Sequence, residues 1–193
     1  MTGRSPLLQS FIDELRAIWA AEPDTGRCME RARLAVVDFV SDPRVQAASV
    51  DWPSTEGRKN LLLYVDPDYH FVINAVVRVP GRKGNVHDHA HAWVLYGVLA
   101  GTESLERYER LDDGTREGYA DVRMTSVSHG TPGAVDLVKP WDIHAEQGGP
   151  TRSVAIIVRS AKLGEVIQNR YDPVGKTILS GPGPAQIPFE MRG

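Results

Sequence analysis

GNVHDH, residues 84–89, places two histidines two positions apart in a part of the chain where short apolar segments follow one another. Side chains at positions i and i+2 of a β-strand point to the same face. If this stretch is extended, His87 and His89 can therefore converge on one metal ion. Imidazole nitrogen suits zinc, copper, iron and nickel alike, so the pattern predicts a metal site without naming the metal.

A third histidine, His144, stands far along the chain at the end of PWDIH, residues 140–144. It is expected to begin another strand, which a barrel can bring beside the first. Three neutral imidazoles leave a divalent ion with open positions for small ligands, whereas a closed structural site takes a fourth protein ligand. We therefore predict that His87, His89 and His144 hold one mononuclear ion. For His91 two alternatives stay open: it orients a ligand histidine, or it points into solvent.

Short apolar or alternating segments separated by turn residues continue on both sides of these motifs. We expect strands at residues 61–65, 71–79, 93–99, 104–110, 122–128, 134–138 and 153–159. Many short strands at this spacing indicate a sandwich or a barrel. Helices do not alternate with the strands, so a parallel doubly wound sheet is not expected. The predicted β-barrel covers residues 57–172, and the tail, residues 173–193, is expected to be extended or loose.

Two segments before the strands have the periodicity of amphipathic helices. Ser5 is expected to cap the first, with Pro6 at its first helical position. The second begins near Thr25 and ends at the Asp42-Pro43 pair. Its buried side is expected to carry Ala32, Leu34, Ala35, Val36, Phe39 and Val40. No catalytic pattern occurs in residues 1–50, so these helices are interpreted as a cap that packs on the sheet.

The 193 residues suit one domain, residues 1–193, with a sizeable core. A formal net charge of -3 gives no electrostatic reason to expect a nucleic acid or an anionic membrane as partner. No apolar segment approaches the roughly 20 residues that span a bilayer, and residues 1–8 lack the layout of a signal peptide. Cys28 is the only cysteine, which excludes an internal disulfide. We expect a cytoplasmic location, and an exposed edge strand could pair two copies as a homodimer.

The two histidine motifs resemble those of the cupin superfamily. GNVHDH together with Gly97 and GTE, residues 101–103, is similar to the first cupin motif, and PWDIH is similar to the second. Within that superfamily the motifs most resemble those of the thiol dioxygenases, meaning cysteine dioxygenase and mercaptopropionate dioxygenase. Their first motif also reads His-Asp-His, and their second contains Asp-Ile-His. The likeness runs from about residue 59 to residue 172, and the N-terminal helices also fit that family.

The resemblance implies a mainly β fold, a cupin double-stranded β-helix or jelly-roll barrel with N-terminal helices, and one iron(II) ion, Fe(II), on three histidines. It also implies addition of both atoms of dioxygen to the sulfur of a small thiol carboxylate, giving a sulfinate. The glutamate ligand of general cupins is absent, because no carboxylate occurs at residues 90–94. This agrees with the three-histidine site of thiol dioxygenases. Val94 stands where cysteine dioxygenases carry a cysteine that cross-links to a tyrosine, so that cross-link cannot form.

Two cations are candidates for holding the substrate. Alignment on residues 60–64 puts Lys59 where the family has a carboxylate-binding arginine or glutamine; the alternative is a solvated lysine at a strand end. The family's His and Tyr pair corresponds to Ile157 and Arg159. Arg159 ends an apolar strand, where a cation is costly to bury without an anion. It could clamp an anion or donate to bound dioxygen, or it could form a salt bridge at the sheet edge.

These departures from the family pattern leave other functions open. Loss of the His and Tyr pair favours a cupin dioxygenase that acts on a carbon substrate instead of a thiol. A third interpretation is a non-catalytic cupin that binds a small ligand. In each case the expected partner is a small molecule, with dioxygen as the co-substrate of the two enzymes. An acceptor should also fix the tautomer of each ligand histidine, and Asp88 or Glu103 could supply one.

Overall fold

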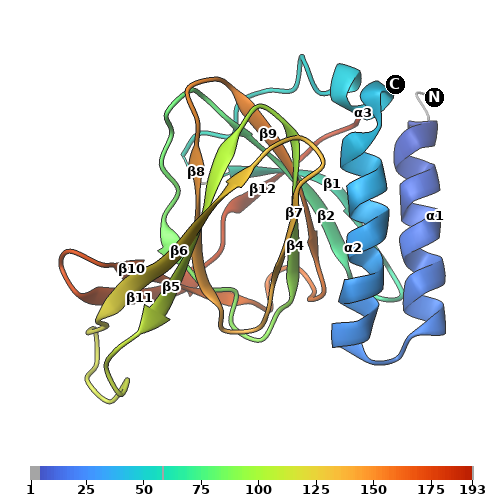
Figure 1. Cartoon of the computed structure of the whole chain (residues 1–193). Coiled ribbons are helices and arrows are strands. Elements are labelled where there is room, and N and C mark those ends of the chain that lie inside the picture. The colour runs from blue at the N-terminus through green and yellow to red at the C-terminus, as the bar shows by residue number, and fades with distance from the viewer. Residues whose placement is uncertain (1–4, 58, 193) are drawn as a thin grey trace.

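The computed structural model describes residues 5–57 and 59–192, which form a β-domain with helices on one side (Figure 1). Three helices come first: α1 (Pro6–Ala21), α2 (Thr25–Ser41) and the short α3 (Pro43–Ala48), which the sequence pattern did not predict. Pro6 is the first residue of α1, and α2 begins at Thr25, as predicted. Leu34 was expected on the buried side of α2, but it is 62% exposed because the buried stripe of that helix passes through Ala32, Ala35 and Val36.

Twelve strands follow in the described part of the chain. They are β1 (Lys59–Val65), β2 (Val72–Arg78), β3 (Val86–His87), β4 (Val94–Ala100), β5 (Glu103–Arg110), β6 (Val122–Gly130), β7 (Val135–Val138), β8 (Ile143–Gly148), β9 (Ser153–Arg159), β10 (Ile167–Asp172), β11 (Thr177–Pro182) and β12 (Ala185–Pro188). One six-stranded sheet has the order β12-β1-β2-β9-β4-β7, and the other has the order β11-β10-β3-β8-β5-β6. Figure 1 shows the two sheets facing each other. The predicted fold, a mainly β double-stranded β-helix with N-terminal helices, is therefore confirmed.

The C-terminal part of the chain differs from its prediction. Residues 173–193 were expected to form an extended or loose tail, but β11 pairs with β10 in one sheet and β12 pairs in parallel with β1 in the other. The pattern predicted no strand after residues 153–159, but β10, which contains Arg170 and Tyr171, follows them. These strands are short and largely polar or exposed, and backbone hydrogen bonds to neighbouring strands hold them without an apolar signature.

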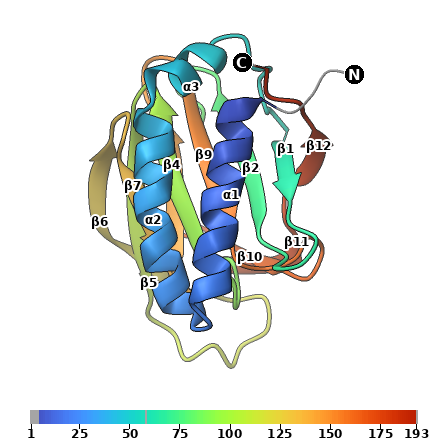
Figure 2. The ribbon, with the colours of Figure 1, turned by 90° about the vertical axis from the view of Figure 1, so that its right-hand side faces the viewer.

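Helices α1 and α2 cover the outer face of the first sheet, as Figure 2 shows. A methyl group at Gly97 in β4 would lie 2.8 Å from Cγ1 of Val36 in α2, so glycine at this position permits the close approach of helix and sheet. Strands β2 and β9 are buried along almost their whole length, because helices cover one face and the second sheet covers the other.

Two predictions from the sequence concern the surface of the molecule: the one about membrane-spanning segments and the one about an exposed edge strand. Among the described residues, no helix is long and apolar enough to cross a membrane. Strand β6 stands at the edge of the second sheet and is exposed from Arg123 to His129. An exposed edge of this kind can pair with another copy, so the homodimer stays a prediction.

Candidate metal centre

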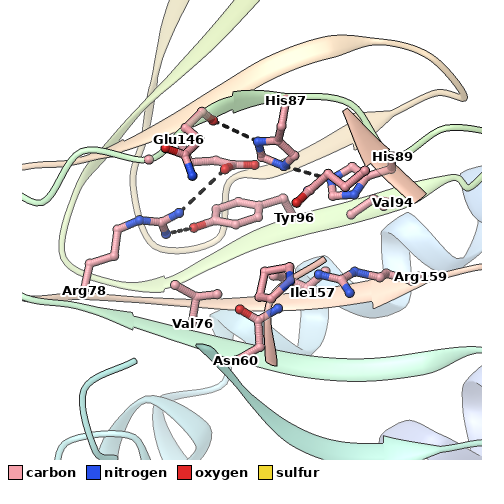
Figure 3. A pocket seen from close by; sticks show the side chains of 14 residues that line it. Asn60, Val76, Arg78, His87, His89, Val94, Tyr96, Glu146, Ile157 and Arg159 are labelled. Carbon is pink, nitrogen blue, oxygen red and sulfur yellow. Dashed lines mark hydrogen bonds and ion pairs between the residues drawn. The ribbon is translucent and has the colours of Figure 1, made fainter. Parts of the chain in front are cut away.

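The three predicted ligand histidines lie together on the inner face of the second sheet. His87 ends β3 and pairs with His144 on the antiparallel strand β8. His89 follows in the next loop, with its Nε2 atom 3.2 Å from Nε2 of His87 (Figure 3). One nitrogen from each of the three rings lies within 4.8 Å of the others. Strand β3 ends at His87 and His89 lies in the loop after it, but the two rings still converge, and strand pairing adds the distant third ligand.

The ring nitrogens of this cluster fit a divalent transition-metal ion. Nδ1 of His144 lies 3.1 Å from Oε1 of Glu146, and Nδ1 of His87 lies 2.9 Å from the carbonyl oxygen of Asn85. Each Nδ1 is therefore assigned as the donor, which leaves a lone pair on Nε2. Nε2 of His144 is buried and has no hydrogen-bond partner among the residues that the structure describes. Such an atom is costly unless something binds it, and a metal ion would do so.

The environment keeps His87 and His89 neutral, which is the form that ligates metals. Burial, with a smaller contribution from His144, lowers the pKa of His87 to about 4. Burial and the neighbouring rings lower the pKa of His89 well below its usual value. Burial alone would raise the pKa of Glu146, but contact with His144 outweighs it and holds that pKa far below the usual range. Glu146 is therefore ionised and can orient His144.

A buried ion network lies behind the histidines. Glu146 is 3.6 Å from Arg78 of β2, and Arg78 in turn contacts Glu103 at 3.2 Å and the Tyr96 hydroxyl. The Tyr96 hydroxyl donates to Glu103 at 2.7 Å, and Ser153 donates to the same carboxylate at 2.6 Å. Burial opposes the charge on Arg78, but these partners raise its pKa overall, so it is a cation. The network links the ligand His144, through Glu146, to the first sheet.

The structure corrects the prediction that Asp88 or Glu103 fixes the ligand tautomers. Glu103 is bound to Arg78 and does not reach a histidine ring nitrogen in any hydrogen bond of the described residues. Asp88 accepts from the backbone of Ala90 (3.0 Å), the amide of Asn169 (2.9 Å) and the hydroxyl of Tyr171 (2.7 Å). The acceptors that face the rings are Glu146 and the Asn85 carbonyl. Asp88 instead fastens the histidine loop to β10.

Replacing Asp88 by alanine is expected to lower the free energy of unfolding by about 2–4 kcal/mol, because three donors lose their acceptor in a buried place. Metal affinity should fall as well, since the loop that carries His89 is released. Urea unfolding and metal titration measure the two effects. Asp51→Ala, at an exposed position, is the matched control and should change neither. Unchanged stability of the Asp88 variant would contradict its anchoring role.

The histidines open onto a cavity of about 90 Å³ between the sheets. Arg159, at the end of β9, lines it together with Asn60, Tyr96, Ile157 and Gln168 (Figure 3). With the Asn60 amide turned so that its oxygen faces Arg159, Nη2 donates to it at 3.0 Å. Nε of Arg159 is buried without a hydrogen-bond partner among the described residues. Burial lowers the pKa of Arg159 to about 10, so the guanidinium stays cationic at neutral pH.

Some of the other residues that the sequence placed at the site line the cavity, and others do not. Lys59 was expected to face the substrate, but its side chain is exposed and it does not line the cavity, because alternation along β1 turns Asn60 inward instead. His91 is exposed, which selects the solvent-facing alternative. Val94 and Ile157 both line the cavity, so the positions taken from the family alignment do face the site. Glu146 was missed, although its position two residues after His144 on one strand was a usable signal.

Comparisons with known proteins found similar solved structures at low identity. No family model and no curated protein matches the sequence. Similar solved structures include an uncharacterized conserved protein with a double-stranded β-helix domain from Klebsiella pneumoniae (18% identity, TM-score 0.43, 63% of this chain and 85% of that chain). They also include oxalate oxidase in complex with glycolate (15%, 0.45, 60% and 57%) and KdgF from Halomonas sp. (16%, 0.42, 54% and 78%).

A likeness at 15–18% identity with TM-scores of 0.42–0.45 says nothing about the reaction. The narrower resemblance to thiol dioxygenases, inferred from the motifs, has no counterpart among these three structures. What the chain can do chemically is therefore judged from its own residues. It is a double-stranded β-helix protein with three inward-facing histidines that can hold one metal ion, beside a cavity that contains a buried arginine.

Proposed function

We propose that the chain is a mononuclear non-haem iron(II) thiol dioxygenase that converts a small thiol carboxylate to a sulfinate. One observation carries this proposal: a three-histidine centre without a carboxylate ligand shares its cavity with a buried, incompletely paired cation, Arg159. The first element suits a metal with open positions, and the second suits an anionic group of the substrate. The motif resemblance supports iron over the other metals that imidazoles accept.

The formal charges in the site favour a doubly anionic substrate. Arg78 carries one positive charge, and Glu103 and Glu146 carry two negative charges, which leaves one negative charge. Arg159 cancels it, and histidines that ligate a metal ion are neutral. A divalent ion would then leave two positive charges in a buried place, where uncompensated charge is costly. A substrate with one thiolate and one carboxylate neutralises both.

Each protein group has a distinct part in this reaction. Iron(II), when bound, supplies open positions for a thiolate and dioxygen together with the redox chemistry that dioxygen activation needs. Arg159, oriented by Asn60, holds the carboxylate and so sets the position of the sulfur. Glu146 holds the His144 ring in the ligating tautomer. Val94 and Ile157 keep the wall of the cavity apolar and limit the access of water.

The proposed conversion balances without a further reductant. A thiolate, R–S⁻, and dioxygen give the sulfinate R–SO₂⁻, with two sulfur–oxygen bonds formed and the dioxygen bond broken. Sulfur loses four electrons and the two oxygen atoms gain four. Both oxygen atoms of one dioxygen molecule are therefore expected in the product, and the partners of the protein are the thiol carboxylate and dioxygen.

A carbon substrate is the second candidate, and one feature of the cavity favours it. Ile157 stands where the family carries a histidine, so no imidazole faces the substrate from β9. An enolised diketone or a catechol that also carries a carboxylate would bring the same two negative charges as a thiol carboxylate. Arg159 would hold it in the same way, and the reaction would cleave a carbon–carbon bond.

Oxygen consumption by the iron(II)-reconstituted protein tests the proposal. With a panel of thiol carboxylates we expect one dioxygen consumed per sulfinate formed, and cysteamine, which lacks the carboxylate, should be a poor substrate. Arg159→Met should lower kcat/KM for thiol carboxylates by about 10–100-fold, the loss expected for hydrogen bonds between charged groups. Its rate with cysteamine should not change.

Controls separate the candidate functions. The His144→Ala variant should consume no dioxygen with any substrate. Uptake with a diketone or a catechol, and none with thiols, would select the carbon substrate. Intact iron binding with no uptake from any thiol would reject thiol oxidation, and tight binding of small ligands without turnover would indicate a non-catalytic binding protein.

A further inference from the structure

A second cavity, of about 430 Å³, lies directly outside the metal centre. It shares His89, Arg159, Gln168 and Pro184 with the inner cavity, so the two are adjacent. Its walls are the segment between β9 and β10, residues 161–166, and the connection between β11 and β12 around Pro184. The C-terminal strands therefore do more than complete the sheets, because they build the outer wall of the approach to the metal.

The lining of this outer cavity is apolar with a cationic inner end. Its apolar members are Ala92, Ala161, Leu163, Val166, Ile167, Pro182, Pro184 and Ala185. Arg159 stands where the inner and outer cavities meet, and Lys162 adds a second cation from the loop. Among the described residues that line it, none is acidic. This combination suits an organic anion with an apolar body.

The volumes of the two cavities indicate which part of the ligand each can hold. The inner cavity, about 90 Å³, has room for the reacting group and dioxygen and for little else. A three-carbon thiol carboxylate would leave the outer cavity, about 430 Å³, filled with water against apolar side chains. Apolar surface of this kind is the part of a pocket from which most ligand affinity comes.

We infer that the substrate is an amphiphilic carboxylate whose head lies between the metal and Arg159 and whose apolar body, of several carbon atoms, fills the outer cavity. The inference rests on the proposed function for the place of the carboxylate, and it adds the class of the substrate. The ligand would extend from the inner to the outer cavity beside the residues that line both among those described, His89, Arg159, Gln168 and Pro184.

Binding of unreactive straight-chain carboxylates, from propionate to octanoate, tests the inference without turnover. The measurement is calorimetric titration of the full chain loaded with zinc, which binds histidines and does not activate dioxygen. Each added methylene should lower Kd by about threefold, close to the gain expected for burying one methylene group. Propionate should bind most weakly and octanoate most tightly.

Three variants test whether the dependence of Kd on chain length comes from the outer cavity. Ala161→Trp should fill the outer cavity, so that octanoate binds no better than propionate while propionate binds as in the parent protein. Leu163→Gln, a smaller change, should reduce the gain per methylene without blocking the cavity. Ala21→Trp, at an exposed position at the end of α1, is the matched control and should keep the full dependence on chain length.

The outcomes distinguish this inference from the proposed function. Equal Kd values for all chain lengths, with binding still lost in Arg159→Met, would overturn the amphiphilic substrate and leave the anion site intact. Full dependence on chain length in Ala161→Trp would also overturn it, because the apolar body would then lie elsewhere. Unchanged binding in Arg159→Met would instead overturn the carboxylate site on which the proposed function depends.

Discussion

The His144→Ala variant is expected to lose stoichiometric binding of iron(II), with a fall in affinity on the order of a thousandfold or more. Loss of an outer partner of a ligand typically costs 10–100-fold, and removal of the ligand itself should cost more. His144 is 1% exposed, and its unsatisfied Nε2 faces the other two rings. With two histidine ligands left, water would fill more coordination positions of the ion, and the ion would be lost to the solvent more easily. The iron content after desalting, and the visible spectrum of the cobalt(II) form, measure the loss.

Two further variants make the first result specific. Glu146→Gln keeps the shape of the side chain but removes the charge that orients His144, and its metal affinity should fall by about 10–100-fold. His91→Ala removes an exposed histidine from the same loop and should bind iron like the parent protein. Normal iron binding in the His144 variant would mean that the ion is held elsewhere, and a large loss in the His91 variant would mean that this histidine is a ligand.

The ligand set could be predicted from the sequence because it depends on local geometry and on a recognisable motif. The spacing of His87 and His89 needs only an extended chain to bring their rings together. The pairing of His87 with His144 is a long-range fact, to which the expected barrel and the resemblance to the second cupin motif pointed. The helical cap was predictable for a similar reason, since its apolar stripes and its proline at the first turn are local signals.

The substrate side of the site could not be predicted to the same degree. A shift of one residue in a strand exchanges its two faces, so an alignment that placed Lys59 at the site missed Asn60, the residue that faces inward. Strands β11 and β12 have almost no buried side chains, and hydrophobic periodicity cannot find strands held by backbone pairing. The outer cavity was therefore invisible in the sequence, because these strands and their connection form one wall.

The second large effect is expected in the buried ion network, where Arg78→Met should lower the free energy of unfolding by about 3–5 kcal/mol. Arg78 is 6% exposed and lies between the carboxylates of Glu103 and Glu146, which are 2% and 5% exposed. The Arg78→Met change leaves the two buried carboxylates without the positive charge between them. For a chain of this length the loss corresponds to a fall in Tm of roughly 10 °C. Urea and thermal unfolding measure both quantities.

Comparison with an exposed ion pair tests whether burial of the charges causes the loss of stability expected for Arg78→Met. Arg123 and Glu109 form a salt bridge between β5 and β6, with side chains that are 67% and 45% exposed. Arg123→Met should therefore change stability by less than about 0.5–1 kcal/mol. Arg78→Lys keeps the charge but cannot contact two carboxylates with a planar fork, so its loss should lie between those of the two methionine variants. Equal losses in Arg78→Met and Arg123→Met would contradict the explanation.

A double-mutant cycle then assigns the loss to the pair of Arg78 and Glu103. Glu103→Gln alone removes the negative charge and one of the two oxygens that accept from Arg78, Tyr96 and Ser153, and should also destabilise the fold. Once Arg78 is methionine, the same change should cost about 1–3 kcal/mol less, because the carboxylate is no longer compensated. Strict additivity would mean that the two groups act independently. Because Arg78 also contacts Glu146, only Arg78→Met, and not Glu103→Gln, should weaken the binding of the metal as well.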